Sequence, residues 1–137
     1  MKLFDIVGPV MIGPSSSHTA GAVKIGLIAR KLLGEKPVKA EILLHGSFAM
    51  TGSGHGTDRA IVAGIMGIRP DDERIPESFE IAHEGEMTFS IDTTHIPNAH
   101  PNSTMIKLQG EHGRKLELVA SSLGGGRIIV SRIDGIT

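Results

Sequence analysis

The stretch TAGAVKIGLIARKLLGEKPVKAEILLH, residues 19–45, decides the fold. Between Thr19 and Leu33 the apolar residues recur at spacings of three and four, which predicts a helix with one face on a core. Gly34 and then Pro37 supply the stop signals of that helix. From Val38 to His45 apolar residues alternate with the residues between them, which is the period of a strand with one buried face. The sequence therefore predicts a helix followed directly by a strand.

Two glycines, Gly21 and Gly26, lie inside the predicted helix. Glycine lowers the stability of a helix relative to alanine. Because it has no Cβ, it also lets another backbone approach closely. The two positions therefore weaken the helix but allow close packing against it.

The segment before this helix reads GPVMIGPSSSHT, residues 8–19. Gly13 and Pro14 predict a turn, and Ser15–Ser17 supply hydroxyl groups and candidate N-caps. The first free N–H groups of a helix, together with its dipole, favour a carboxylate or a phosphate. A well-capped helix start is the alternative interpretation. Three consecutive serines followed by His and Thr favour an anion-binding site.

A glycine-rich loop is predicted over residues 46–56, and it leads to a second helix. Thr57 or Asp58 can cap that helix, and Gly67 can end it. His55 has a glycine on each side, which gives the backbone freedom to present the imidazole. Asp58 could orient this histidine or serve only as a cap. The glycine spacing is wrong for a dinucleotide site, and no lysine follows to make a phosphate loop.

The rest of the chain reads as a polar surface connection followed by strands. The connection covers residues 69–85, and the strands are expected at 87–91, 104–108, 116–120 and 127–133, with a hairpin loop at 110–113. Residues 3–7 are too short to assign. This order predicts an α+β fold: two layers, with a mixed, mostly antiparallel sheet and the helices on one face.

Two further segments combine turn-forming and polar residues. HIPNAHPN, residues 95–102, places His100 or Asn102 at the entrance of a strand, although turn chemistry alone also explains such a cluster. SSLGGG, residues 121–126, lets a ligand or another backbone come close, or is simply a flexible connection. The histidines of these segments and of the earlier loops lack any standard metal-ligand spacing. We therefore expect no metal ligands from this chain.

Composition excludes several classes of partner. The 137 residues carry a formal net charge of −1 and no polybasic run, and Phe is the only aromatic residue, so we expect neither nucleic acid nor an anionic membrane as a partner. No apolar run approaches the ~20 residues of a membrane span, and a signal peptide is not recognisable, so we expect a cytoplasmic protein. The chain has no cysteine and cannot hold an iron–sulfur cluster through thiolates.

Four motifs together carry a resemblance: GPVMIGPSSSHTAG, GSFAMTGSGHGTDRA, HPNS and SSLGGGR, in this order. They resemble the β subunit of the iron–sulfur-dependent bacterial L-serine dehydratase, also called L-serine ammonia-lyase, over nearly the whole chain. The resemblance implies an α chain as partner, which carries the cysteine ligands of a four-iron four-sulfur cluster, and L-serine as substrate. It also implies a fold similar to the allosteric substrate-binding domain of D-3-phosphoglycerate dehydrogenase.

The resemblance further implies roles for individual residues. Ser15, Ser16, Ser17 and Thr19 would capture the substrate carboxylate at the start of the first helix, with His18 as a second catalytic candidate beside them. His55 would be the base that takes the Cα proton, and the ordinary pKa of a histidine, near ~6.5, suits that task. Asn102 is a weaker candidate for a substrate contact. An open iron of the cluster would act on the serine hydroxyl as a Lewis acid.

The sequence leaves three points open. We expect one domain over residues 1–137, whereas two-chain members of the family often continue into a regulatory domain of the ACT type, so the chain could be a fragment of a longer subunit. Homodimerisation and the preference for serine over threonine are also open. The main alternative function is a regulatory binding domain that senses an amino acid or a hydroxy acid.

Overall fold

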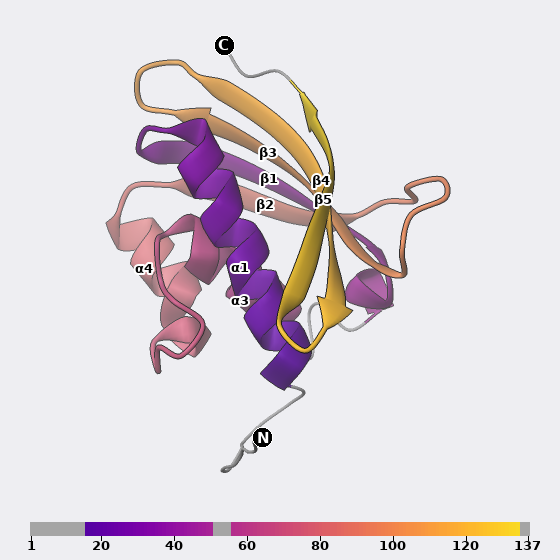
Figure 1. Ribbon diagram of the computed structural model, residues 1–137. Helices are drawn as coiled ribbons and strands as arrows, with labels where there is room; N and C mark the ends of the chain where they lie inside the picture. Colours follow the sequence, from indigo (N-terminus) through magenta and orange to yellow (C-terminus); the bar gives the residue numbers. More distant parts are fainter. Residues whose placement is uncertain (1–15, 51–55, 135–137) are drawn as a thin grey trace.

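A computed structural model of the protein describes residues 16–50 and 56–134 (Figure 1). It is a two-layer α+β structure with a five-stranded sheet and helices packed on one face. The elements, in chain order, are α1 (Ser16–Leu33), β1 (Pro37–Gly46), α3 (Thr57–Ile65), the short 3₁₀ helix η1 (Ile75–Glu77), α4 (Ser78–Glu84), β2 (Thr88–Thr93), β3 (Asn102–Gly110), β4 (Lys115–Gly124) and β5 (Arg127–Asp134). The predicted fold class is therefore confirmed.

The sheet has the strand order β2-β1-β3-β4-β5. β1 pairs with β2 in parallel, and the other three pairings are antiparallel. A parallel pair needs a crossover connection, which here consists of the segment from α3 to α4. Ile42, Ile106 and Leu118 lie opposite one another on β1, β3 and β4, and all three are fully buried under the helices.

The two long helices cross at a pair of glycines. A Cβ built on Gly26 would lie 2.7 Å from the backbone nitrogen of Ile65, and one built on Gly64 would lie 2.7 Å from that of Leu27. Both distances are well below a normal van der Waals contact. The close approach that Gly26 allows is thus confirmed, and α3 provides its partner.

The predicted stop signal at the C-terminal end of α3 is confirmed, whereas the predicted side-chain cap at its N-terminal end is not. Gly67 has φ 87°, its N–H donates to Gly64 O, and the next N–H, of Ile68, donates to Ala63 O, which is a Schellman motif. The N-cap prediction for α3 is wrong, because Gly56 occupies that position with φ 86° and no side chain caps the helix. The Asp58 carboxylate instead accepts from the adjacent N–H, 2.7 Å away.

Three predicted boundaries or loops are corrected by the structure. α1 begins at Ser16, so the second and third serines belong to the helix and not to a preceding turn. Residues 47–50 are helical, and Phe48 among them is 2% exposed, so this part of the glycine-rich segment is anchored in the core. β4 extends to Gly124, which leaves only a tight turn where a connection over 121–126 was expected.

The region predicted as a surface connection, residues 69–85, contains η1 and α4. Ser78 at the start of α4 is fully buried, and its hydroxyl donates to Arg59 O at 2.6 Å. Phe79 packs against Phe89 of β2 with ring centroids 4.9 Å apart, and the Arg59 guanidinium lies 4.2 Å from the Phe79 ring centre. These tertiary contacts stabilise a helix of seven residues whose own sequence signal is weak.

Among the described residues, the helices are too short or too polar for any of them to cross a lipid bilayer.

Candidate functional site

The two long helices begin at the same end of the fold. Their contacts advance in the same direction, because Gly26 of α1 meets Ile61 and Gly64 of α3, while Arg30 further along donates to Ile65 O at 2.9 Å. The segments that precede both helices are the serine-rich and the glycine–histidine motifs of the sequence. The structure therefore brings the helical ends of the two motifs to one end of the sheet.

The last residue of β1 meets the first residue of β3 at this same end. Gly46 pairs with Asn102, and the Ser47 N–H donates to Pro101 O at 2.7 Å. Gly46 has φ 63°, and a Cβ there would collide with the Pro101 carbonyl group. Only glycine fits without strain, so the strand can turn sharply into the helical residues 47–50. The HPNS segment is thus fixed beside the end of β1.

His45 is a member of this end that the sequence did not single out. It is the penultimate residue of β1 and only 8% exposed. Its Nδ1 accepts the N–H of Ile96 at 2.9 Å, so this nitrogen carries no proton in the observed arrangement. Its ring lies 5.4 Å from the ring of His95. The sequence signal for His45 is its position immediately before a glycine-rich loop. The sequence did not single it out, because the alternation in β1 places His45 among the residues that face away from the core.

A buried chain of hydroxyl groups continues from this point. Ser103 Oγ donates to His100 O at 2.5 Å and lies 2.7 Å from Ser121 Oγ. Because the single proton of Ser103 is used for His100, Ser121 is the donor between the two serines. Ser103 is fully buried, and Ser121 is 4% exposed. This chain of bonds connects the segment 95–102 to the SSLGGG segment, two strands away from β1.

The SSLGGG segment in turn lies against the first turns of α1. A Cβ on Gly21 would collide with the Ser122 side chain, so the helix and β4 touch at this glycine. The turn that follows holds Gly124, Gly125 and Gly126 with φ of 89°, 64° and 75°. Lys24 Nζ donates to Gly126 O at 2.8 Å. The turn is therefore held beside the serine-rich helix start.

The predicted site residues are placed as follows. Ser15 and His55 lie outside the described residues. Ser16, Ser17 and His18 form the first helical residues of α1. Thr19 follows them and is half-buried, and Asn102 opens β3, where its N–H donates to His100 Nδ1 at 3.0 Å. Convergence of the side chains of His18 and His55 on one ligand stays a prediction.

Metal-binding groups and strongly shifted pKa values are not found at this end among the described residues. In residues 16–50 and 56–134, no three side chains of His, Asp or Glu are grouped to hold a metal ion. The clear pKa shifts of the described residues belong to Asp72 and Arg74 in the connection after α3. A hydrogen bond from the Arg74 guanidinium lowers the pKa of the Asp72 carboxyl to about 2 and raises that of Arg74.

These features define an α+β domain in which a polar end, rich in Gly, Ser and His, is assembled from two helix starts and three strand ends. The family model of the serine dehydratase beta chain matches residues 2–93. This match covers more than half of the sequence, and the chain belongs to that family.

Relatives agree with this assignment. The chain is 46% identical over 134 residues to the L-serine dehydratase, beta chain, of Peptoniphilus asaccharolyticus, and the match covers 97% of this chain and 60% of that protein. It is 44% identical over 134 residues to the probable L-serine dehydratase, beta chain, of Bacillus subtilis strain 168, again over 60% of the relative. L-serine dehydratase 2 of Escherichia coli K12 matches over 52% of this chain and 16% of its own length, with 44% identity. The chain thus spans about three fifths of the two beta chains.

Proposed function

We propose that this chain is the β subunit of an L-serine dehydratase that works together with an α chain. The reaction removes the Cα proton and the β-hydroxyl of L-serine as water, and hydrolysis of the resulting enamine gives pyruvate and ammonia. The observation that supports the proposal best is that the described parts of four family motifs meet at one end of the fold. The names of the two related beta chains support serine as substrate and a companion chain as partner.

In this proposal the chain supplies the binding and proton-transfer half of a shared site. The free N–H groups of the first turn of α1, at Ser16 to His18, would bind the substrate carboxylate with help from the helix dipole. Ser15 and Thr19 would add hydroxyl contacts, and Asn102 would hold the substrate from the start of β3. His55 would take the Cα proton, a step for which a positioned base contributes about 10²–10⁴-fold in rate.

The cluster cannot be held by residues of this chain through thiolates, because the sequence has no cysteine. The proposal therefore assigns the four-iron four-sulfur cluster to the α chain, as the family resemblance implies. The steps assigned to His55 and to the start of α1 concern this chain alone.

The test is a reconstitution of the chain with its cluster-bearing α chain, followed by measurement of pyruvate from L-serine. We expect His55→Ala to lower kcat about 10²–10⁴-fold while it still assembles with the α chain on a sizing column. His112→Ala is the matched control, because the side chain of His112 is 76% exposed in the 110–113 loop at the far end of β3. Undiminished turnover by His55→Ala would show that the base assignment is wrong.

A titration of the isolated chain with L-serine separates the proposal from the sensor alternative. A half-site is expected to bind serine weakly or not at all, because the second half lies on the α chain. Millimolar or tighter binding, measured by calorimetry without any α chain, would favour an amino-acid-sensing domain instead.

A further inference from the structure

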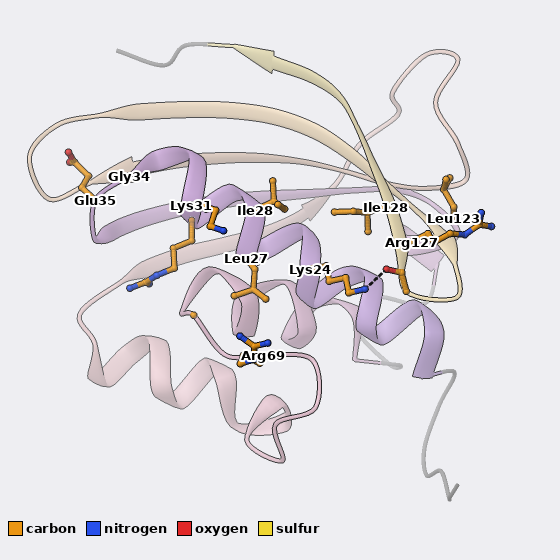
Figure 2. Close-up of a pocket in the computed structure, with 13 residues that line it drawn as sticks. Lys24, Leu27, Ile28, Lys31, Gly34, Glu35, Arg69, Leu123, Arg127 and Ile128 are labelled. Carbon is orange, nitrogen blue, oxygen red and sulfur yellow. Dashed lines mark hydrogen bonds between the residues drawn. The ribbon is translucent and has the colours of Figure 1, made fainter. Parts of the chain in front are cut away.

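A long groove runs along α1, between this helix, the β4–β5 hairpin and the residues that follow α3. It has a volume of about 1120 Å³ and reaches from the β4–β5 turn to the residues after α1 and α3. Leu27 and Ile28 of α1 form its floor together with Leu123 and Ile128 of the β4–β5 hairpin (Figure 2). Leu27 and Ile28 are only partly buried although α1 already packs another face on the core. Leu27 also packs against the edge of the core, so α1 presents to the groove an apolar strip that the described residues cover only in part.

The rim of the groove is strongly basic. Its charged lining residues are Lys24, Arg30, Lys31, Arg69, Arg127 and Glu35. Five cations against one carboxylate give this surface a net charge of +4 in a chain whose total is −1, so the remaining residues sum to −5. Such a separation of charge favours an anionic occupant and raises the rate at which one is captured.

Most of these cations are available to an occupant. The charged side chains of Lys31, Arg69 and Arg127 make no hydrogen bond or ion pair with any residue in the described ranges. Lys24 and Arg30 each use one N–H on a backbone carbonyl, at 2.8 Å and 2.9 Å, and keep the others. The single carboxylate of the groove, that of Glu35, already accepts two backbone hydrogen bonds. Its donors are the N–H of His112, at 2.6 Å, and the N–H of Arg114, at 3.3 Å.

The dimensions of the groove fit a peptide better than a small acid. The lining residues of α1 and its C-cap run from Lys24 to Gly34, which at 1.5 Å per residue corresponds to about 15 Å. An extended segment of about five residues covers that length. A single metabolite carboxylate would contact only part of the cations and little of the apolar floor.

A second copy of the chain fits this surface poorly. A two-fold contact through the groove would place one +4 surface against another, and like charges facing each other oppose association. A head-to-tail contact between the groove and an acidic surface of a neighbour would give rings or open chains of many copies, and the closed two-fold dimer is by far the commonest form of oligomer. A different chain is the better occupant.

From this charge, length and apolar floor, we propose that the groove docks a segment of the companion α chain that carries aliphatic side chains flanked by carboxylates. The inference rests on the proposed function, since that function requires an α chain. The position of the groove agrees with it: one end lies at the Lys24–Gly126 bond, beside the serine-rich start of α1. A segment docked there would bring the α chain to the edge of the half-site that it is expected to complete.

The test compares two double charge reversals in their assembly with the α chain. Lys31→Glu with Arg69→Glu alters the groove at exposed cations that have no partner in the described structure. Lys39→Glu with Lys115→Glu is the matched control: it makes the same change of net charge at exposed lysines paired with Gln109 on the sheet. Melting temperatures first verify that both variants are folded. We expect the Kd for the α chain to rise about 10–100-fold for the groove variant and less than about threefold for the control, with a larger difference at low salt.

The outcomes separate the inference from the proposed function. Equal Kd values for the groove variant and the control, in a mixture whose wild-type form produces pyruvate, would overturn the inference and leave the function standing. A wild-type mixture that neither assembles nor produces pyruvate would overturn both. Two other occupants are also tested on the isolated chain. If 10 mM inorganic phosphate stabilises the wild type and the control against heat but not the groove variant, the groove binds a small anion and docking of the α chain is overturned. If the wild type and the control self-associate and the groove variant does not, the groove binds a second copy and docking of the α chain is likewise overturned.

Discussion

Alanine at Gly64 tests the close backbone approach of α1 and α3 where the two helices cross. The added Cβ would lie 2.7 Å from the Leu27 nitrogen and 2.8 Å from the Gly26 Cα, and closer still to the Val23 carbonyl oxygen. Carbon atoms in ordinary contact are about 3.5 Å apart, so relief of the Gly26 contact alone would separate the helices by roughly 0.7 Å, and the closer Val23 contact requires more. All three groups belong to the backbone of α1 and cannot rotate away.

The expected cost can be worked out from these contacts. Overpacking of this kind costs about 1–3 kcal/mol, and a clash with rigid backbone belongs at the upper end. Alanine regains about 1 kcal/mol relative to glycine through its helix propensity. The net destabilisation by Gly64→Ala is therefore about 2 kcal/mol, which for a chain of this length lowers Tm by roughly 8 °C.

Thermal and urea unfolding of three variants measure this effect. Gly85→Ala is the control, because Gly85 has φ −80° and its Cβ would meet mainly the terminal methyl of Met66, which can move; we expect a change within about 0.5 kcal/mol. Gly26→Ala should destabilise like Gly64→Ala, and the double variant should lose less than the sum, because helices already separated accept the second methyl. A Tm of Gly64→Ala equal to or above that of the wild type would refute the close crossing.

Three further predictions concern single polar contacts. Ser103→Ala should destabilise by about 1–2 kcal/mol in urea unfolding, since it leaves the buried Ser121 hydroxyl without its acceptor. Ser121→Ala should cost less, because Ser103 keeps its bond to His100 O. The double variant should cost less than the sum of the two, and strict additivity would contradict the bond between the serines. His45→Ala removes the acceptor of a backbone N–H and should cost about 1–3 kcal/mol, whereas His45→Asn, which keeps an acceptor near Nδ1, should cost less; equal losses would argue against that bond. Asp72→Asn should lower Tm slightly at pH 7. Because the folded-state pKa of Asp72 is depressed to about 2 from 3.8, its contribution is present above pH 3.8 and is lost as the pH falls toward 2, so the Tm difference should shrink over that range; a constant difference would show that the Arg74 pair is not its source.

The main elements of the fold could be predicted because their signals are local. The 3.6-residue period of α1, the alternation in β1 and the glycines that end both long helices are sequence patterns with a direct backbone cause. The order of these elements was sufficient to predict an α+β fold with mostly antiparallel strands.

The features that the sequence missed depend on contacts between distant segments. α4 is stabilised by the bond from Ser78 to Arg59 and by packing of Phe79 on β2, neither of which is visible in a window of seven residues. β4 continues through Ser121 and Ser122 because β3 and β5 pair with this part of the strand. The position of His45 follows in the same way from the 95–102 segment, whose backbone folds over the end of β1.

The candidate site could be predicted as a set of motifs, and the structure adds how the described parts of those motifs meet. No single window shows that residues near 20, 46, 102 and 122 share one end of the sheet, since this follows from strand order and from the direction of α3. The individual roles of His18 and His55 rest on the family resemblance, and reconstitution with the α chain tests them.

The loop at 110–113 has a practical consequence for studying the assembly. It lies at the opposite end of β3 from Asn102, and eight residue steps of a strand separate them by roughly 26 Å. Because the chain has no cysteine, His112→Cys would introduce its single thiol, on a side chain that is 76% exposed. A fluorophore attached there would report the arrival of a second subunit by energy transfer, at one defined position and well clear of the serine-rich helix start.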